Sequence, residues 1–187
     1  ITATANYANV TLGAIGGTGT GELLSTLNLT ADNSATLSFG DITADTTNST
    51  TDNAMTITAS STTGATIDLD SISNTFGSIT GNFTGGGSVN GNASDKWAAD
   101  DITLTIATGG TITELEATDD IVITATNSAA LTFTTLDAGS AAGGDIDITK
   151  TGSGALTVGA FTAGAGTVTV DASGSTGAVS ITGTAIT

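Results

Sequence analysis

Short stretches in which every second residue is apolar recur along the whole chain. In one kind, two apolar residues flank a third residue and a polar turn follows, as in Leu27-Asn28-Leu29 before Thr-Ala-Asp-Asn-Ser. Later copies begin at Met55, Ile121, Ile146 and Val168. A period of two is typical of strands with one buried face, and no segment carries an apolar stripe with the 3.6-residue period of a helix. The pattern therefore predicts an all-β chain.

A second kind of stretch follows the polar turns and reads apolar-x-apolar-x-x-apolar. Its copies are Val10/Leu12/Ile15, Leu37/Phe39/Ile42, Ile67/Leu69/Ile72, Leu131/Phe133/Leu136 and Leu156/Val158/Phe161. Strands of the first kind start at 102, 121, 146 and 168, and strands of the second kind start at 112, 131, 156 and 179. Because the two series advance in step, they indicate one repeating unit that holds two short strands.

Units of this length with short strands are typical of solenoids, in which each coil lies on the one before it. The prediction is a right-handed parallel β-helix, whose coils stack about 4.8 Å apart and whose inward Val, Ile, Leu and Phe form a narrow core. The absence of Pro from the chain agrees with this, because every central strand must donate its amides. The alternative is an antiparallel β-sandwich built from the same strands.

The repeat predicts one domain over residues 1–187, either a single solenoid or a fragment of a longer one. Residues 81–101 depart from the pattern, because they read GNFTGGGSVNGNASDKWAADD and include the single Trp of the chain. We expect an irregular insertion there. Trp97 is then expected to cover an apolar gap or coil edge, or alternatively to contact a neighbouring subunit or a ligand.

Composition removes several classes of function. The chain has no Cys and no His, which excludes thiol and Ser-His-Asp catalysis and the usual zinc sites, so we expect no enzymatic activity. Its 18 acidic residues face two basic ones, Lys96 and Lys150, and two cations cannot neutralise a run of phosphates in a nucleic acid. No apolar run approaches the roughly 18 residues of a membrane span, so we expect no direct membrane insertion.

Some of the acidic residues recur just before successive strands. Asp101 precedes Ile102, Asp120 precedes Ile121 and Asp145 precedes Ile146, while Asp100 and Asp119 lie one residue earlier. If the coils stack, these carboxylates lie above one another and repel, and a hard cation with oxygen ligands would relieve the repulsion. We therefore expect Ca²⁺ at these five aspartates, against the alternative that each is a separately hydrated turn residue.

Two other patterns have weaker chemical interpretations. Asp68 and Asp70 flank Leu69 on one strand, as paired carboxylates do in glycosidases, although outward acids are common in solenoids. Thr-x-Thr pairs occur at Thr56/Thr58, Thr103/Thr105 and Thr111/Thr113. Stacked on successive coils, such pairs would form flat arrays of hydroxyl and methyl groups of the kind that ice-binding solenoids use.

The segments AVSITGTAIT, GTVTVDASGSTGAV, GALTVGAFTAGAG and DIVITATNS resemble the β-strand-repeat regions of bacterial surface-layer proteins and large secreted adhesins. The resemblance implies an acidic β-helical protein that assembles outside the cell, often with Ca²⁺ between subunits. We expect an extracellular structural protein of the cell surface that forms a surface layer or filament. An adhesin stalk and an ice-binding solenoid are the alternatives.

The two ends of the given chain, ITATANY and VSITGTAIT, also have the composition of strands. Unpaired strands at the ends of a solenoid are capped, continued by more chain or paired with another molecule. This interpretation predicts either a longer chain or a lattice or filament of identical copies.

Overall fold

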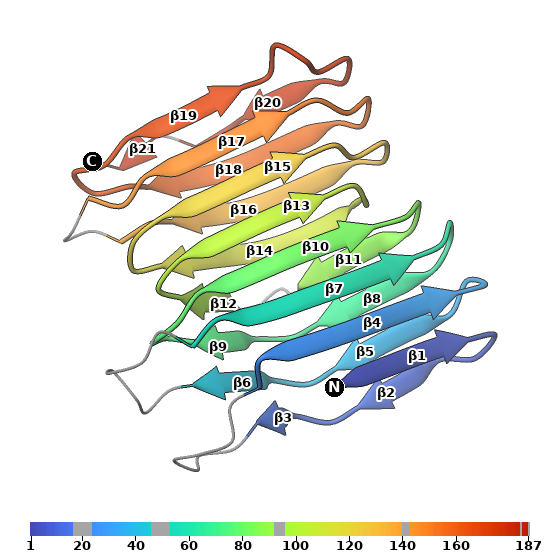
Figure 1. The fold of residues 1–187 in the computed structure, drawn as a ribbon. Helices are drawn as coiled ribbons and strands as arrows, with labels where there is room; N and C mark the ends of the chain where they lie inside the picture. The colour runs from blue at the N-terminus through green and yellow to red at the C-terminus, as the bar shows by residue number, and fades with distance from the viewer. Residues whose placement is uncertain (17–23, 46–52, 92–95, 140–142, 184, 187) are drawn as a thin grey trace.

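The computed structural model describes the chain except for residues 17–23, 46–52, 92–95, 140–142, 184 and 187. Every regular element in the described residues is a β-strand, and every strand pair is parallel. The chain runs along the front of the molecule, returns along the back and climbs with each circuit, which makes a right-handed β-solenoid (Figure 1). The predicted parallel β-helix is confirmed, and the antiparallel sandwich is wrong.

Three parallel sheets form the sides of the solenoid, and we call them sheets A, B and C. Sheet A is the front sheet in Figure 1 and has eight strands. In order along the solenoid its strands are β1 (Thr2–Asn6), β4 (Thr26–Asp32), β7 (Met55–Ser61), β10 (Ile79–Thr84), β13 (Ile102–Ile106), β15 (Ile121–Ala125), β17 (Ile146–Lys150) and β19 (Val168–Asp171).

Sheets B and C form the remaining sides of the solenoid. Sheet B consists of β2 (Val10–Leu12), β5 (Thr36–Phe39), β8 (Thr66–Leu69) and β11 (Ser88–Gly91). Sheet C consists of β3 (Ile15–Gly16), β6 (Ile42–Asp45), β9 (Ile72–Asn74), β12 (Lys96–Ala99), β14 (Gly110–Ala117), β16 (Leu131–Asp137), β18 (Leu156–Thr162), β20 (Val179–Ile181) and β21 (Ala185–Ile186), of which β20 and β21 both pair with β18.

The cross-section changes along the solenoid. Coils up to β12 have three separate strands, whereas in the coils that begin with β13, β15 and β17 a single longer strand takes the place of the sheet B and sheet C strands. In the last coil, β20 and β21 are again separate. The longer strands still bend, since the pairing of β14 with β16 passes from Ile112↔Phe133 directly to Glu114↔Thr135. The bend falls on the two residues between the second and third apolar positions of the apolar-x-apolar-x-x-apolar stretches. That spacing therefore marks a corner of the coil.

The interior is one continuous column of apolar side chains. Along sheet A the inward residues pair coil by coil, as in Leu104↔Ile123 and Ile123↔Ile148, and all three are almost completely buried. Burying a side chain of this size contributes roughly 1.5–3 kcal/mol. Because each coil buries its apolar face only against its neighbours, the core depends on the stacking of the coils.

Residues 81–101 mostly belong to the regular coil, which corrects the expected insertion for the described residues. They complete β10 and supply β11 and β12, one strand to each sheet, and only 92–95 lie outside the described residues. Gly81 occupies a position in an inward column. A larger residue does not fit there, because a Cβ would lie 2.5 Å from Cε2 of Phe83. The aromatic rings of Phe83 and Trp97 fill this part of the core, with their centroids 5.8 Å apart.

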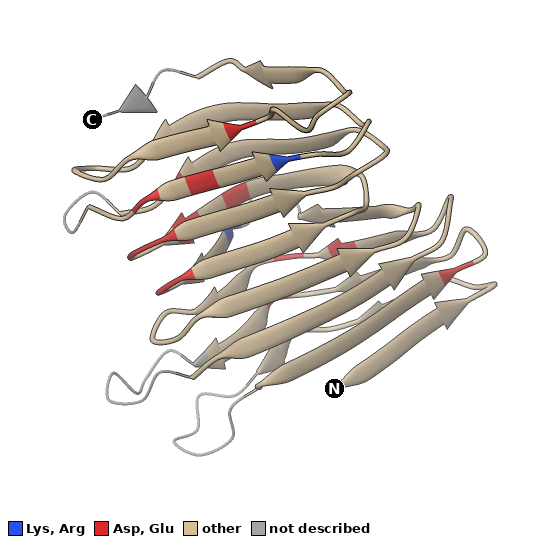
Figure 2. Ribbon diagram, turned by 45° about the horizontal axis from the view of Figure 1, so that its top comes forward, with Lys and Arg blue, Asp and Glu red and all other residues tan. Residues whose placement is uncertain are grey.

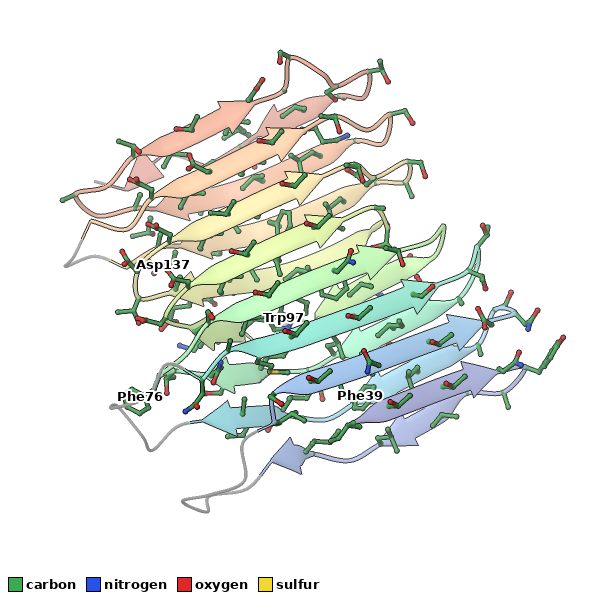
Figure 3. The ribbon with its side chains drawn as sticks, viewed as in Figure 1. Phe39, Phe76, Trp97 and Asp137 are labelled. Carbon is green, nitrogen blue, oxygen red and sulfur yellow. The ribbon has the colours of Figure 1, made fainter. Side chains whose placement is uncertain are left out.

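Trp97 is 1% exposed and occupies the same column as Ile72 and Leu115 of the neighbouring coils (Figure 3). Its indole Nε1 donates to the backbone oxygen of Asp70 at 3.2 Å. It is a core residue that fills apolar space beside Phe83, so the expectation of a position at a coil edge is wrong, and so is the alternative of a contact with a neighbouring subunit or a ligand.

Candidate functional site

The aspartates that precede the strands of sheet A lie on successive coils, as predicted. Asp101, Asp120 and Asp145 stand immediately before β13, β15 and β17 at the corner where the chain enters sheet A. We call these three residues the aspartate column. Figure 2 shows acidic residues along this edge of the molecule.

Hydrogen bonds link the aspartate column from coil to coil. The backbone amide of Asp120 donates to Oδ1 of Asp101 at 3.2 Å, and that of Asp145 donates to Oδ1 of Asp120 at 2.8 Å. Thr167 continues the series, because its amide and hydroxyl donate to Oδ1 of Asp145 at 2.7 and 2.9 Å. Each carboxylate therefore fastens its own coil to the next one.

The remaining two predicted residues, Asp100 and Asp119, are exposed neighbours of the column and are joined through their backbones, at 2.9 Å. The pKa of Asp119 is raised, above all by the adjacent charge of Asp120, with burial and the other carboxylates of the cluster adding to the effect. The pKa of Asp145 is lowered by the hydrogen bonds from Thr167. The two carboxylates thus differ: the surroundings destabilise the ionised form of Asp119 and stabilise the ionised form of Asp145.

The arrangement of the carboxylates bears on the expected Ca²⁺. Within the described residues no group of three or more Asp, Glu, His or Cys side chains gathers closely enough to hold a metal ion. The column spreads its carboxylates along the solenoid axis instead of around one point, and one oxygen of each already accepts an amide. The described residues therefore form no ready-made cage, and calcium binding along the five aspartates stays a prediction.

The outer side of sheet A carries the second candidate surface. On β4, β7, β10 and β13 the first two outward positions are all exposed and hold only Thr or Asn. We call this set the Thr/Asn face; its members are Thr26, Asn28, Thr56, Thr58, Thr80, Asn82, Thr103 and Thr105.

The register stacks these residues in two straight columns. One column passes from Thr56 to Thr80 and on to Thr103, and the other pairs Thr58 with Asn82. Two of the three Thr-x-Thr pairs singled out in the sequence, Thr56/Thr58 and Thr103/Thr105, lie on this face. The third does not, because Thr113 falls at the bend of β14 and leaves Thr111 on another side of the solenoid.

A groove of about 510 Å³ lies on the outer side of sheet B, and Asp68 and Asp70 both line it. The side chain of Asn90 donates to Oδ1 of Asp68 at 3.1 Å and joins β11 to β8. Asp68 therefore has a structural partner on the next coil, like the carboxylates of the aspartate column. The glycosidase-like interpretation of this pair gains no support from these contacts.

Lys150 is a buried charge that was not among the residues expected to matter from the sequence. It lies at the end of β17 in an inward column, paired with Ala125, and its side chain is fully buried. Its Nζ donates to the backbone oxygen of Gly152 at 2.5 Å, and burial lowers its pKa. The alternation of Ile146, Ile148 and Lys150 was the available signal, since it places Lys150 on the inward side of the strand.

No family model, curated protein or solved structure matches this chain. The described residues include no helix long and apolar enough to cross a membrane.

Proposed function

We propose that this chain is a non-catalytic structural part of an extracellular surface protein, which assembles with copies of itself into a surface layer or filament. The observation that carries the proposal is the continuity of the solenoid. Sheet A passes from β1 to β19 through parallel pairs without a break, around one apolar column. A rod held together in this way keeps its shape along its axis, which is what a stalk, a fibre or a lattice needs.

Assembly of copies has a physical basis in the same architecture. Each coil presents a row of backbone donors and acceptors to the next coil, so a coil from another copy can extend the sheets by the pattern that joins coils within the chain. A net charge of −16 opposes this approach, and divalent cations between the copies would reduce the repulsion. This is the role that we propose for Ca²⁺.

Negative-stain electron microscopy of the purified protein with Ca²⁺ and with a chelator tests the proposal. We expect ordered sheets or fibres in Ca²⁺ and fewer or shorter assemblies in chelator. Single rods in both conditions would contradict self-assembly and would fit an adhesin stalk instead. A melting temperature that is unchanged by Ca²⁺ and chelator would contradict a structural cation.

A further inference from the structure

We propose that the Thr/Asn face of sheet A binds ice. This is a function beyond the structural role, and it rests on the outer surface of β4, β7, β10 and β13. All eight residues of the face are exposed, and none is charged. Figure 1 shows the four strands lying side by side along the front of the solenoid.

The face is a two-dimensional grid whose spacings come from the backbone. Neighbouring strands lie about 4.8 Å apart, and alternate residues on one strand lie about 6.6 Å apart. Each Thr offers one methyl and one hydroxyl group, and its branched Cβ restricts the side chain to few rotamers. Repeats of this size resemble the distances between oxygen atoms on the surfaces of an ice crystal, so water molecules held in the grid can match the lattice.

The chemistry of the face distinguishes ice from other partners. Protein interfaces depend on large aromatic or Arg anchors that fill pockets, and the eight residues include neither. A charged mineral surface would require carboxylates or ammonium groups, whereas the acidic residues lie mainly at the corners and on the other sides of the solenoid (Figure 2). An uncharged, regular array of donors, acceptors and methyl groups suits a surface made of water.

The site also has an end. On β15 and β17 the column that contains Thr103 continues with Val122 and then Asp147, whereas the column that contains Thr105 continues with Thr124 and Thr149. An ionised carboxylate holds its own hydration shell and interrupts the grid. We therefore place the ice-binding surface on β4 to β13, and we expect the later coils to contribute little to it.

Thermal hysteresis and adsorption to a growing ice crystal test the proposal directly. The test variants are Thr80→Lys and Thr103→Lys, which place a long charged side chain in the middle of the grid. The matched control is Thr111→Lys, which makes the same change at an exposed, outward Thr on β14, away from the face. Circular dichroism melting of all four proteins shows whether they remain folded.

We expect the unmodified protein and Thr111→Lys to lower the freezing point below the melting point and to enter ice. Thr80→Lys and Thr103→Lys should lose most of this activity while melting at the same temperature as the unmodified protein. Absence of hysteresis and of ice adsorption in the unmodified protein would overturn the proposal. Equal loss of activity in Thr111→Lys would overturn the assignment to this face. Because the readout is ice activity, failure here leaves the assembly seen by electron microscopy unaffected.

Discussion

The Thr/Asn face and the aspartate column lie on successive lengths of the solenoid that meet at β13, yet their side chains relate to the fold in opposite ways. The carboxylates of Asp101, Asp120 and Asp145 accept hydrogen bonds from the next coil and hold the stack together. The Thr and Asn side chains point away from the core into solvent. One surface is charged and structural, and the other is uncharged and exposed.

The difference teaches where a functional explanation is needed. The recurrence of Asp before three successive strands is accounted for by coil-to-coil hydrogen bonding. Outward strand residues accept many polar side chains at little cost in stability. High strand propensity alone favours Thr there, but it does not favour Asn, which is normally depleted in strands. Strand propensity therefore accounts for the six Thr of the face but not for its two Asn.

The largest expected effect is on the free energy of unfolding, and it compares an inward residue with an outward residue of the same strand. In β13, Leu104 is 1% exposed and its neighbour Thr103 is exposed. We expect Leu104→Ala to lower the free energy of unfolding by about 2–5 kcal/mol, because it leaves a cavity in the continuous core. Thr103→Ala should change it by no more than about 0.5 kcal/mol.

Chemical denaturation of the two variants measures both values. A large loss of stability in Thr103→Ala would show that the Thr/Asn face helps to hold the fold. The comparison between the two surfaces would then fail, because both would have structural functions.

Much of this architecture could be predicted from the periodicity. The apolar-x-apolar-x-x-apolar spacing places Leu131 and Phe133 before a corner and Leu136 after it, so the bend was already present in the pattern. The stacking of Asp101, Asp120 and Asp145 followed from matched steps between coils. Stacking requires only that corresponding positions recur once in each coil, and this recurrence is visible in the sequence.

Other features depend on three-dimensional complementarity that periodicity does not contain. Gly81 breaks the apolar pattern because the ring of Phe83 fills the space where a side chain would point. This compensation between a small and a large residue depends on packing in three dimensions. For the same reason, residues 81–101 resembled an insertion. The membership of the Thr/Asn face required the strand register, since Thr111 has the same sequence pattern as Thr103 but lies on another side of the solenoid.

The second prediction concerns the aspartate column. Asp145→Ala removes the acceptor of both hydrogen bonds from Thr167, and we expect a fall of a few degrees in the melting temperature at neutral pH. Asp147→Ala is the matched control, because Asp147 is an exposed, outward residue of the adjoining strand β17. It should leave the melting temperature nearly unchanged.

The effect of Asp145→Ala should depend on pH in a defined direction. The pKa of Asp145 is lowered in the folded state, so its stabilising contribution is present above the usual value of 3.8 and is lost as the pH falls through the lowered pKa. Melting curves from neutral to acidic pH should therefore converge for the variant and the unmodified protein. A constant difference at every pH would contradict the role of the ionised carboxylate.

The smallest expected effect has the opposite sign and comes from the residue next to the column. Because neighbouring carboxylates raise the pKa of Asp119, its ionised form destabilises the folded protein, and the penalty disappears as the pH falls through the raised pKa. Asp119→Asn should therefore raise the melting temperature slightly at neutral pH and low salt, and added salt should reduce the gain by screening the exposed charges. Calorimetry of this variant beside Asp145→Ala would give shifts of opposite sign if hydrogen bonding stabilises the column while charge repulsion opposes it. A loss of stability in Asp119→Asn would instead mean that its carboxylate has a binding partner, and Ca²⁺ would be the first ion to test.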